Sequence, residues 1–460
     1  MTQSSTGATN KNVVLIIATV SAFVVPFLVS SINVALPKMS SDLHMEAVVM
    51  TWVNTIYFLA IAMAQVPMGR LADIYGRKKL YLLGLVISIV ASVSAALSSS
   101  VVMLLISRAF QGIGAGMTFN TIIAILTSVF PAEARGKALG INMTGTYGGL
   151  IMGPLVGGLL TDEFGWQSIF IFSACCSFLL IVPVFFYLKG EWREARGEKF
   201  DLAGSITYGI AMAMFMYGFS TLPGWPGMVF LVLGIAGLLY FVRRELKMTS
   251  PILDFSLFQR NRVFLFSNLA TLINYLATFA VTFLLSLYLQ HIKELEPDQA
   301  GLVLMASSIP MTIITPLAGR LSDRIEPRLV AAAGMAVGCL ALVLLIFLSN
   351  STPIWYIILT LVLYGIGIGL FSSPNTNAIM GSVERKVLGV ASGTIGTMRT
   401  GGMMLSMGIM MILFSIYIGQ AEITPVYYPQ FLASSRVGFI IFTALGIGGV
   451  LAQLAARKKA

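Results

Sequence analysis

The chain contains fourteen apolar stretches, most of them about 20 residues long, and this feature restricts the fold more than any other. Hydrophobic residues make up 57% of the chain and charged residues only 10%, whereas a soluble domain has roughly 25% charged residues. So few charges cannot cover a globule in water. We therefore predict an all-α membrane protein with fourteen transmembrane helices. The stretches are 14–36, 47–68, 80–98, 101–128, 138–160, 167–188, 203–221, 226–243, 263–290, 300–319, 329–348, 353–373, 388–417 and 434–456.

The basic residues predict the orientation of these spans. Of the 29 Lys and Arg residues, Arg108 and Arg399 lie deep in spans, and only Lys38, Lys293 and Arg436 fall in loops on one side. All the others fall in the loops and tails on the opposite side. Because cytoplasmic loops are enriched in Lys and Arg, we expect both termini in the cytoplasm and a multi-pass protein of the cell membrane.

The sequence has no pattern that indicates catalysis, a cofactor or a metal. Its three cysteines and two histidines have no metal-ligand spacing, and no nucleophile motif is present. A Walker A motif for ATP is also missing. The net charge of +10 comes from short loops, so it does not predict nucleic-acid binding. A membrane enzyme or a receptor without transport therefore has no support in the residues.

A repeated loop indicates two related halves. Residues 69–79 read Gly-Arg-Leu-Ala-Asp-Ile-Tyr-Gly-Arg-Lys-Lys, and residues 319–328 read Gly-Arg-Leu-Ser-Asp-Arg-Ile-Glu-Pro-Arg. Internal repeats of this kind are common in transporters, with the substrate site between the halves. We predict a 6+2+6 arrangement: a six-helix bundle in residues 1–189, an inserted pair in 190–262, and a second six-helix bundle in 263–460.

Several motifs together resemble the major facilitator superfamily, in particular its fourteen-span drug:proton antiporter branch. Besides the loop at 69–79, they are Arg108-Ala-Phe-Gln-Gly-Ile-Gly-Ala-Gly116, Gly153-Pro-Leu-Val-Gly-Gly158, Phe200-Asp-Leu-Ala-Gly204, and Gly389-Val-Ala-Ser-Gly393 with Arg399. The resemblance implies a major facilitator fold and a secondary transporter that exports small amphipathic molecules by alternating access. It implies no cofactor beyond a proton gradient, and we expect a monomer that contacts a small-molecule substrate and membrane lipid.

The repeated loop has a physical interpretation as a gate. Gly69, Asp73 and Arg77 in the first loop, and Asp323 in the second, are its candidate residues. Asp73 can pair with Arg77 and can accept hydrogen bonds from a helix N-terminus of the other half. A loop that only sets topology would explain the basic residues, but it would not explain an acid at the same place in both halves.

A second group of candidates lies inside the fifth span. Pro154 removes one backbone hydrogen bond and can kink the helix. Gly153, Gly157 and Gly158 allow a partner helix to come close. We expect a hinge or a tight packing seam here, although a proline is also tolerated in ordinary membrane helices.

The candidates for substrate binding or coupling are polar groups within spans. A mid-membrane arginine is costly unless it faces a polar cavity or partner, which singles out Arg108 and Arg399. For Arg108 the alternatives are bonds to backbone carbonyls near the first or fifth span, an effect on a nearby proton relay, or extension of its side chain toward the nearer membrane surface. The other candidates are Asn33, Ser30, Tyr147 and Asn274, and each of them could equally bond a neighbouring helix.

The first span departs from the branch at one position. Aligned on Asn33 to Pro37, Leu28 stands where the branch usually has an acid. No Asp or Glu lies well inside any predicted span, so coupling would have to use a span-end acid such as Glu133 or Asp162, or be absent. A cavity with two arginines and no acid favours anions or neutral amphiphiles. An organic-anion or metabolite carrier is therefore the alternative to a multidrug exporter.

Overall fold

The computed structural model contains one long helix for each predicted span, which confirms the count of fourteen. It describes residues 10–45, 47–222, 224–248, 251–253, 255–295, 297–419 and 425–457. The first six long helices are α1 (Lys11–Leu43), α2 (Ala47–Tyr75), α3 (Arg77–Ala96), α4 (Val101–Val129), α5 (Ala132–Phe164) and α6 (Gln167–Tyr187). The inserted pair is α7 (Leu202–Ser220) and α8 (Trp225–Glu245). The last six are α10 (Arg262–Leu287), α11 (Pro297–Ser322), α12 (Pro327–Ile346), α13 (Ile354–Gly381), α14 (Leu388–Tyr417) and α15 (Tyr428–Ala455).

Four short helical elements join these long helices. A five-residue helix, α9 (Ser256–Arg260), precedes α10, and a π-helical turn (Tyr288–Ile292) continues α10 at its other end. Two 3₁₀ turns, Arg385–Val387 and Pro425–Tyr427, lead into α14 and α15. Several helices extend beyond the predicted stretches, because polar end residues continue the helix past the apolar core.

Thirteen of the long helices are apolar enough to cross a membrane by length and composition alone. The exception is α5, which carries eight glycines between residues 136 and 158 as well as polar residues at both ends. It still spans 33 residues, enough to cross a bilayer of about 30 Å. Its low hydropathy comes from these small and polar residues.

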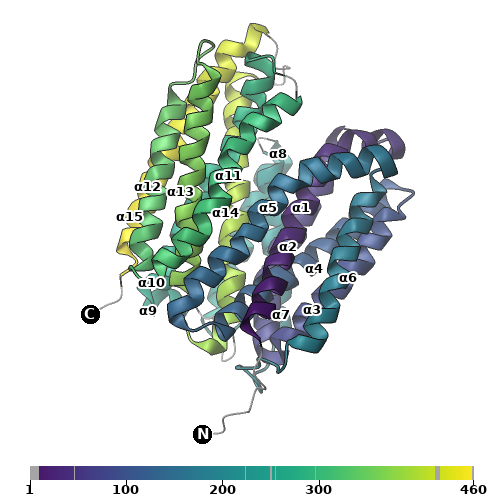
Figure 1. Cartoon of the computed structure of the whole chain (residues 1–460), viewed down its shortest axis with the longest axis vertical. Coiled ribbons are helices and arrows are strands. Elements are labelled where there is room, and N and C mark those ends of the chain that lie inside the picture. The colour runs from purple at the N-terminus through teal and green to yellow at the C-terminus, as the bar shows by residue number, and fades with distance from the viewer. Residues whose placement is uncertain are drawn as a thin grey trace.

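The helices form two six-helix groups with the inserted pair beside them (Figure 1). Within the first group, α1 packs on α5, α2 on α4, and α3 on α4 and α6. Within the second group, the corresponding pairs α10 and α14, α11 and α13, and α12 with α13 and α15 are in contact. Helices α7 and α8 pack on each other, and α7 also touches α2 and α14. This is the predicted 6+2+6 arrangement.

The two halves meet through two equivalent helix crossings, α2 with α14 and α5 with α11. At the first crossing a Cβ on Gly69 would clash with the carbonyl oxygen of Gly389, and the reverse also holds. At the second crossing a Cβ on Gly136 would clash with the carbonyl oxygen of Gly319, and a Cβ on Gly319 with that of Gly136. These backbones touch only because neither residue has a side chain.

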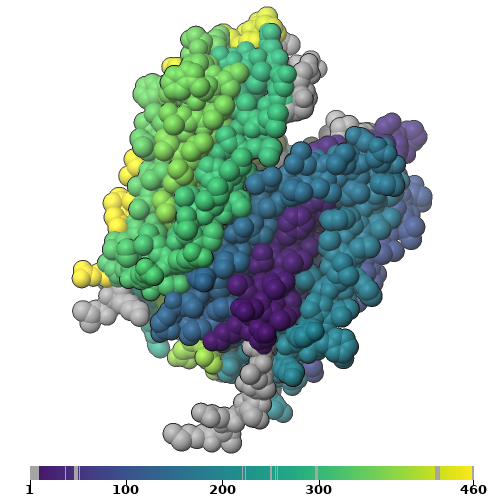
Figure 2. Space-filling view, viewed as in Figure 1, coloured from purple at the N-terminus to yellow at the C-terminus, as the bar shows by residue number. Residues whose placement is uncertain are grey.

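The halves are in contact at the end where the N-terminus lies, and a notch separates them at the opposite end (Figure 2). The two glycine crossings lie beside the loops that join α2 to α3 and α11 to α12, so they close the end that carries the repeated loops. The structure therefore has one closed side and one side hollowed between the halves.

Candidate functional site

Asp73 lies at the end of α2 and is completely buried. Its Oδ1 accepts hydrogen bonds from Arg77 Nε (3.0 Å) and Nη2 (2.7 Å). The same carboxylate accepts from the backbone N–H groups of Gly389 (3.0 Å) and Val390 (3.1 Å), in the first turn of α14. A helix N-terminus favours a negative charge. Asp73 therefore joins the first half to the second through charge-assisted bonds.

Arg77 extends this contact to two other segments. It is also completely buried. Its Nη1 donates to Ser128 Oγ in α4 (2.6 Å), and its Nη2 donates to the carbonyl oxygen of Arg385, just before α14 (2.5 Å). The ion pair thus links α2, α3, α4 and the start of α14 at one point on the closed side.

The connector between α6 and α7, residues 188–201, covers this loop. Arg77 N donates to the Trp192 carbonyl (3.1 Å), and Ala195 N donates to the Asp73 carbonyl (3.1 Å). Glu191 Oε1 accepts from Lys78 N (2.8 Å) at the N-terminus of α3. Gly76, which has a φ of +121°, permits this approach because a Cβ there would overlap the Glu191 side chain. No motif in the sequence indicates this contact.

Glu198 in the same connector joins the two halves. It forms ion pairs with Arg70 of α2 and with Lys386, which precedes α14 (2.5 Å to Lys386 Nζ). Burial alone would raise the pKa of the Glu198 carboxyl, but the hydrogen bonds and charges of Lys386 and Arg70 outweigh it and lower that pKa. Glu198 therefore stays ionised in the neutral pH range.

Asp323 occupies the equivalent place in the second half. Its Oδ1 accepts from Gly136 N (2.7 Å) and its Oδ2 from Lys137 N (2.9 Å), near the start of α5. The acid of each loop thus binds backbone N–H groups near the start of a helix in the opposite half. Asp323 is only half-buried, and no side-chain ion pair to it occurs among the described residues. The role of both loops in gating stays a prediction.

The glycines of α5 form a packing seam against α1. A Cβ on Gly153 would lie 2.5 Å from Ser30 Cβ, and one on Gly157 would lie 2.5 Å from Ser31 Cβ. Gly158 has no such constraint, because its nearest neighbour is 3.9 Å away. Pro154 is exposed, and α5 continues through it as one helix. The seam thus involves Gly153 and Gly157, which lie one turn apart on the same face.

Arg108 is completely buried inside the first half. Its Nε donates to the Val53 carbonyl (3.0 Å), its Nη1 to Gln111 Oε1 (2.6 Å) and its Nη2 to Asn54 Oδ1 (3.2 Å). The guanidinium also lies 4.1 Å from the ring centroid of Tyr57. The carbonyl that it binds belongs to α2, so our expectation of the first or fifth span was wrong. The cost of burying its charge is offset by these bonds.

Two of the other candidates take part in helix packing. Asn33 is exposed, and its Oδ1 accepts from Asn54 Nδ2 (2.6 Å), which connects it to the network of Arg108. Ser30 Oγ donates to the Leu150 carbonyl of α5 (3.2 Å). The span-end acids Glu133 and Asp162 are both exposed, at opposite ends of α5.

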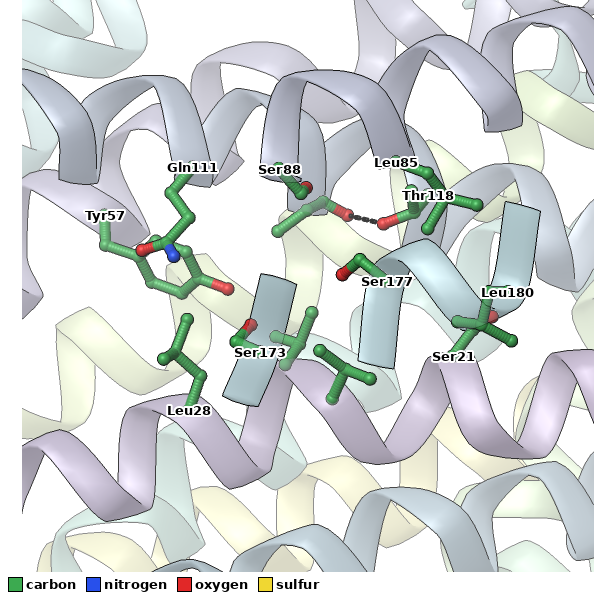
Figure 3. A pocket seen from close by; sticks show the side chains of 13 residues that line it. Ser21, Leu28, Tyr57, Leu85, Ser88, Gln111, Thr118, Ser173, Ser177 and Leu180 are labelled. Atoms are coloured by element: carbon green, nitrogen blue, oxygen red, sulfur yellow. Dashed lines mark hydrogen bonds between the residues drawn. The ribbon is translucent and has the colours of Figure 1, made fainter. Parts of the chain in front are cut away.

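Leu28 lines a cavity of about 30 Å³ within the first bundle. The other lining groups include the side chains of Tyr57, Gln111, Ser173 and Ser177 (Figure 3). A cavity of this size with several polar partners can hold one or two water molecules. The position where the branch usually has an acid therefore faces a small hydroxyl-rich space, and Leu28 contributes an apolar wall to it.

Arg399 lies between the halves. It is half-buried on α14, and its guanidinium lies 4.2 Å from the ring centroid of Phe119 on α4. No described acid forms an ion pair with it. A cation without a counter-ion among the described residues thus packs against an aromatic side chain of the opposite half.

The last two candidates are Tyr147 and Asn274, which have different surroundings. The Tyr147 hydroxyl, on α5, lies 2.8 Å from Ser372 Oγ on α13, which is a further polar contact between the halves. Asn274 on α10 is buried, and its Nδ2 has no hydrogen-bond partner among the described residues. Arg399 and Tyr147 thus lie at contacts between the halves and Asn274 is buried in the second half, whereas Arg108, Asn33 and Ser30 lie within the first bundle.

Sequence reasoning missed the glycines that receive the two loop acids, although a signal was present. Residues 136–140 read Gly-Lys-Ala-Leu-Gly and residues 389–393 read Gly-Val-Ala-Ser-Gly. The two segments share a Gly-x-Ala-x-Gly pattern, and each begins with the glycine whose N–H binds the acid of the opposite loop. Comparison of the two halves by this pattern would have paired Gly136 with Asp323.

Comparison with known proteins agrees with this geometry. Residues 18–407 and 267–459 match the profile of the Major Facilitator Superfamily. The riboflavin transporter RibZ of Clostridioides difficile (strain 630) is 30% identical over 414 residues, which cover 89% of each chain. The multidrug resistance protein Stp of Mycobacterium tuberculosis (strain ATCC 25618 / H37Rv) is 29% identical over 386 residues, 82% of this chain and 71% of Stp.

A solved structure shows the same fold. The human organic anion transporter MFSD10 (TETRAN) superposes with a TM-score of 0.70 over 98% of this chain and all of that one, at 14% sequence identity. At this identity the likeness concerns the fold alone. With the profile match, the 30% identical relative and the paired six-helix bundles, this multi-pass chain is a secondary transporter rather than an enzyme, and it belongs to the Major Facilitator Superfamily.

Proposed function

We propose that this chain exports small amphipathic aromatic molecules, anionic or uncharged, from the cell by alternating access. The observation that carries the substrate class is Arg399, which lies between the halves beside Phe119 and pairs with no acid of the described residues. A desolvated cation attracts anions and rejects other cations. The Phe119 ring beside it offers flat apolar surface for an aromatic ring.

The outward direction is supported by two observations. The relative Stp is named a multidrug resistance protein, and the Gly153-Pro154 motif resembles the one that marks exporters in this family. In the proposed orientation both termini are cytoplasmic, so the closed side faces the cytoplasm and the notch faces outward. This conformation would be the one that releases substrate.

The two loops provide a mechanism for the conformational change. Asp73 and Asp323 hold opposite halves together through helix N-termini, and the glycine crossings let the backbones touch. Breaking these contacts would open the cytoplasmic side. We propose that both loops close when the outward-facing state forms and separate when the cytoplasmic side admits substrate.

A flux assay in proteoliposomes tests the substrate class. Three fluorescent aromatic compounds differ in charge: fluorescein is anionic, riboflavin uncharged and ethidium cationic. We expect transport of the first two and little of ethidium, because Arg399 has no acid to offset its charge. Riboflavin is included because the relative RibZ is named a riboflavin transporter.

Two variants sharpen this test. Arg399→Gln should remove the preference for the anion, whereas Arg436→Gln, an exposed arginine in α15, should leave it unchanged. Transport of ethidium alone by the natural chain would contradict the proposed substrate class. It would instead favour export of organic cations, and stimulation by an imposed pH gradient would then assign proton coupling.

A further inference from the structure

A groove lies on the outer surface of the second half, where two helices end. The N-terminal end of α10 and the preceding α9 form one wall, and the C-terminal end of α15 forms the other. These elements lie side by side near the C-terminus (Figure 1). The groove encloses about 690 Å³, a volume typical of sites for small organic ligands.

The lining of the groove has a polar part and an apolar part. Arg262, Arg457 and Gln259 supply its polar groups, and Phe258, Phe266 and Leu454 supply much of its apolar surface. None of the lining residues is acidic. Both arginines are exposed, and neither forms an ion pair with a described residue. The groove therefore combines two free guanidinium groups with an apolar floor.

The charged groups that the structure describes near the groove do not neutralise these arginines. Glu326 is the acid whose charge interacts with Arg457, and it is already bound to Arg328 (2.9 Å from Arg328 Nε). Arg328 in turn donates to the Leu454 carbonyl at the end of α15 (2.8 Å). The positive charge at the groove is thus available to a ligand.

The depth of the groove indicates which ligand it meets. The apolar spans of α10 and α15 begin at Arg262 and end at Ala455, so the arginines lie at headgroup level and the apolar residues below them. This is the side that we propose to be cytoplasmic, and the cytoplasmic leaflet carries anionic lipids. Guanidinium groups bind phosphate in bidentate fashion.

We propose that this groove binds one anionic phospholipid of the cytoplasmic leaflet. Arg262 and Arg457 hold the phosphate, Gln259 bonds the headgroup, and the acyl chains lie along Phe266 and Leu454. The site is separate from the substrate region around Arg399, so it does not depend on the proposed substrate. A bound lipid would tie the α9–α10 segment to the end of α15.

Native mass spectrometry of the purified full chain tests this proposal. The protein is reconstituted in nanodiscs of phosphatidylcholine mixed with phosphatidylglycerol, and the lipids that remain bound after release are counted. Each basic residue near an anionic surface accounts for about a fivefold change in affinity. We expect the double variant R262Q/R457Q to bind phosphatidylglycerol about 30-fold more weakly and to retain phosphatidylcholine like the natural chain.

A matched control has the same change of charge elsewhere. Arg243 and Lys247 are exposed on the same side, at the end of α8 and just after it, and do not line the groove. R243Q/K247Q should therefore retain phosphatidylglycerol. Equal retention by the two double variants would overturn the proposal. Thermal stabilisation by inorganic phosphate as large as that by short-chain phosphatidylglycerol would also overturn it, because the groove would then be a site for free phosphate.

Discussion

The two repeated loops share a sequence pattern and a type of contact, but they differ in how firmly the contact is held. Asp73 is completely buried and binds both Arg77 and the start of α14. Asp323 is half-buried and binds only backbone N–H groups of α5. The residue in Asp323's loop that corresponds to Arg77 is Pro327. The first loop therefore has an internal counter-ion that the second lacks.

The connector adds to this difference. Residues 188–201 bond the first loop at Asp73, Arg77 and Lys78, and Glu198 reaches Lys386 of the second half. The described residues around Asp323 include no comparable segment. Yet the glycine crossings beside the two loops are alike, Gly69 with Gly389 and Gly136 with Gly319. The packing between the halves is thus symmetric, whereas the electrostatic contacts between them are concentrated at the first loop.

The largest effect is expected from Asp73→Asn. Removing one partner of a buried ion pair costs about 3–5 kcal/mol, because Arg77 would remain buried without its counter-charge. The closed state should lose stability relative to the open one by a factor of about 100 or more, and flux should fall accordingly. Distance measurements between spin labels on the two halves, combined with flux in proteoliposomes, check this.

The control for this variant is Glu326→Gln, which removes an exposed acid from the second loop. It should leave both distances and flux close to those of the natural chain. If Asp73→Asn transports as well as this control, the first loop does not act as a gate.

The next largest effect should come from the glycine crossings, and it should be equal in the two halves. Gly69→Ala and Gly319→Ala each force a methyl group against a backbone carbonyl, and overpacking of this kind costs about 1–3 kcal/mol. We expect both variants to disfavour the closed state to a similar degree in the same distance measurement. Gly301→Ala on α11, where a Cβ meets nothing within 4 Å, is the matched control. A large difference between the two crossings would refute the symmetry of packing.

Much of the fold was predictable because it depends on local composition. Each membrane span is an apolar stretch of sufficient length, and the repeat at residues 69 and 319 indicates duplicated halves. Even α5 was predicted, although its hydropathy is the lowest of the long helices. The boundaries of the two bundles and the inserted pair at 189 and 262 stay predictions, since no observation tests them.

The contacts of the candidate site were predictable only where a side chain has few kinds of partner available to it. An acid beside a helix end favours an arginine one turn away and a helix N-terminus, so both kinds of partner could be anticipated for Asp73. The partners of Arg108 could not, because any exposed carbonyl satisfies a guanidinium, and the nearest one proved to be Val53. The roles of Glu191, Trp192 and Glu198 in the connector depend on a tertiary contact with no periodic signal in the sequence.

A smaller effect is expected from Asp323→Asn. The amide oxygen can still accept one backbone hydrogen bond, and water screens the lost charge at this half-buried position. We expect the closed state to lose about 1 kcal/mol of stability. Flux should therefore fall, but by a factor several times smaller than in Asp73→Asn. Parallel flux measurements on the two variants check this, with the protein amount matched in each vesicle preparation. If the two variants are equally impaired, the two loops are equivalent, and the ion pair of Asp73 with Arg77 does not strengthen the first loop.

The smallest effect should come from Glu198→Gln, since partly exposed ion pairs contribute about 0.2–1 kcal/mol. The pKa of Glu198 is lowered in the folded chain, so its ion pairs contribute fully above the ordinary pKa of a glutamate and are lost only as the pH falls through the lower folded value. The variant should therefore destabilise the closed state slightly, and by the same amount throughout the neutral pH range. Glu194→Gln, an exposed residue of the same connector, should change nothing. A pH-dependent difference between these two variants near neutrality would show that Glu198 titrates there, and the connector would then sense protons rather than only join the two halves.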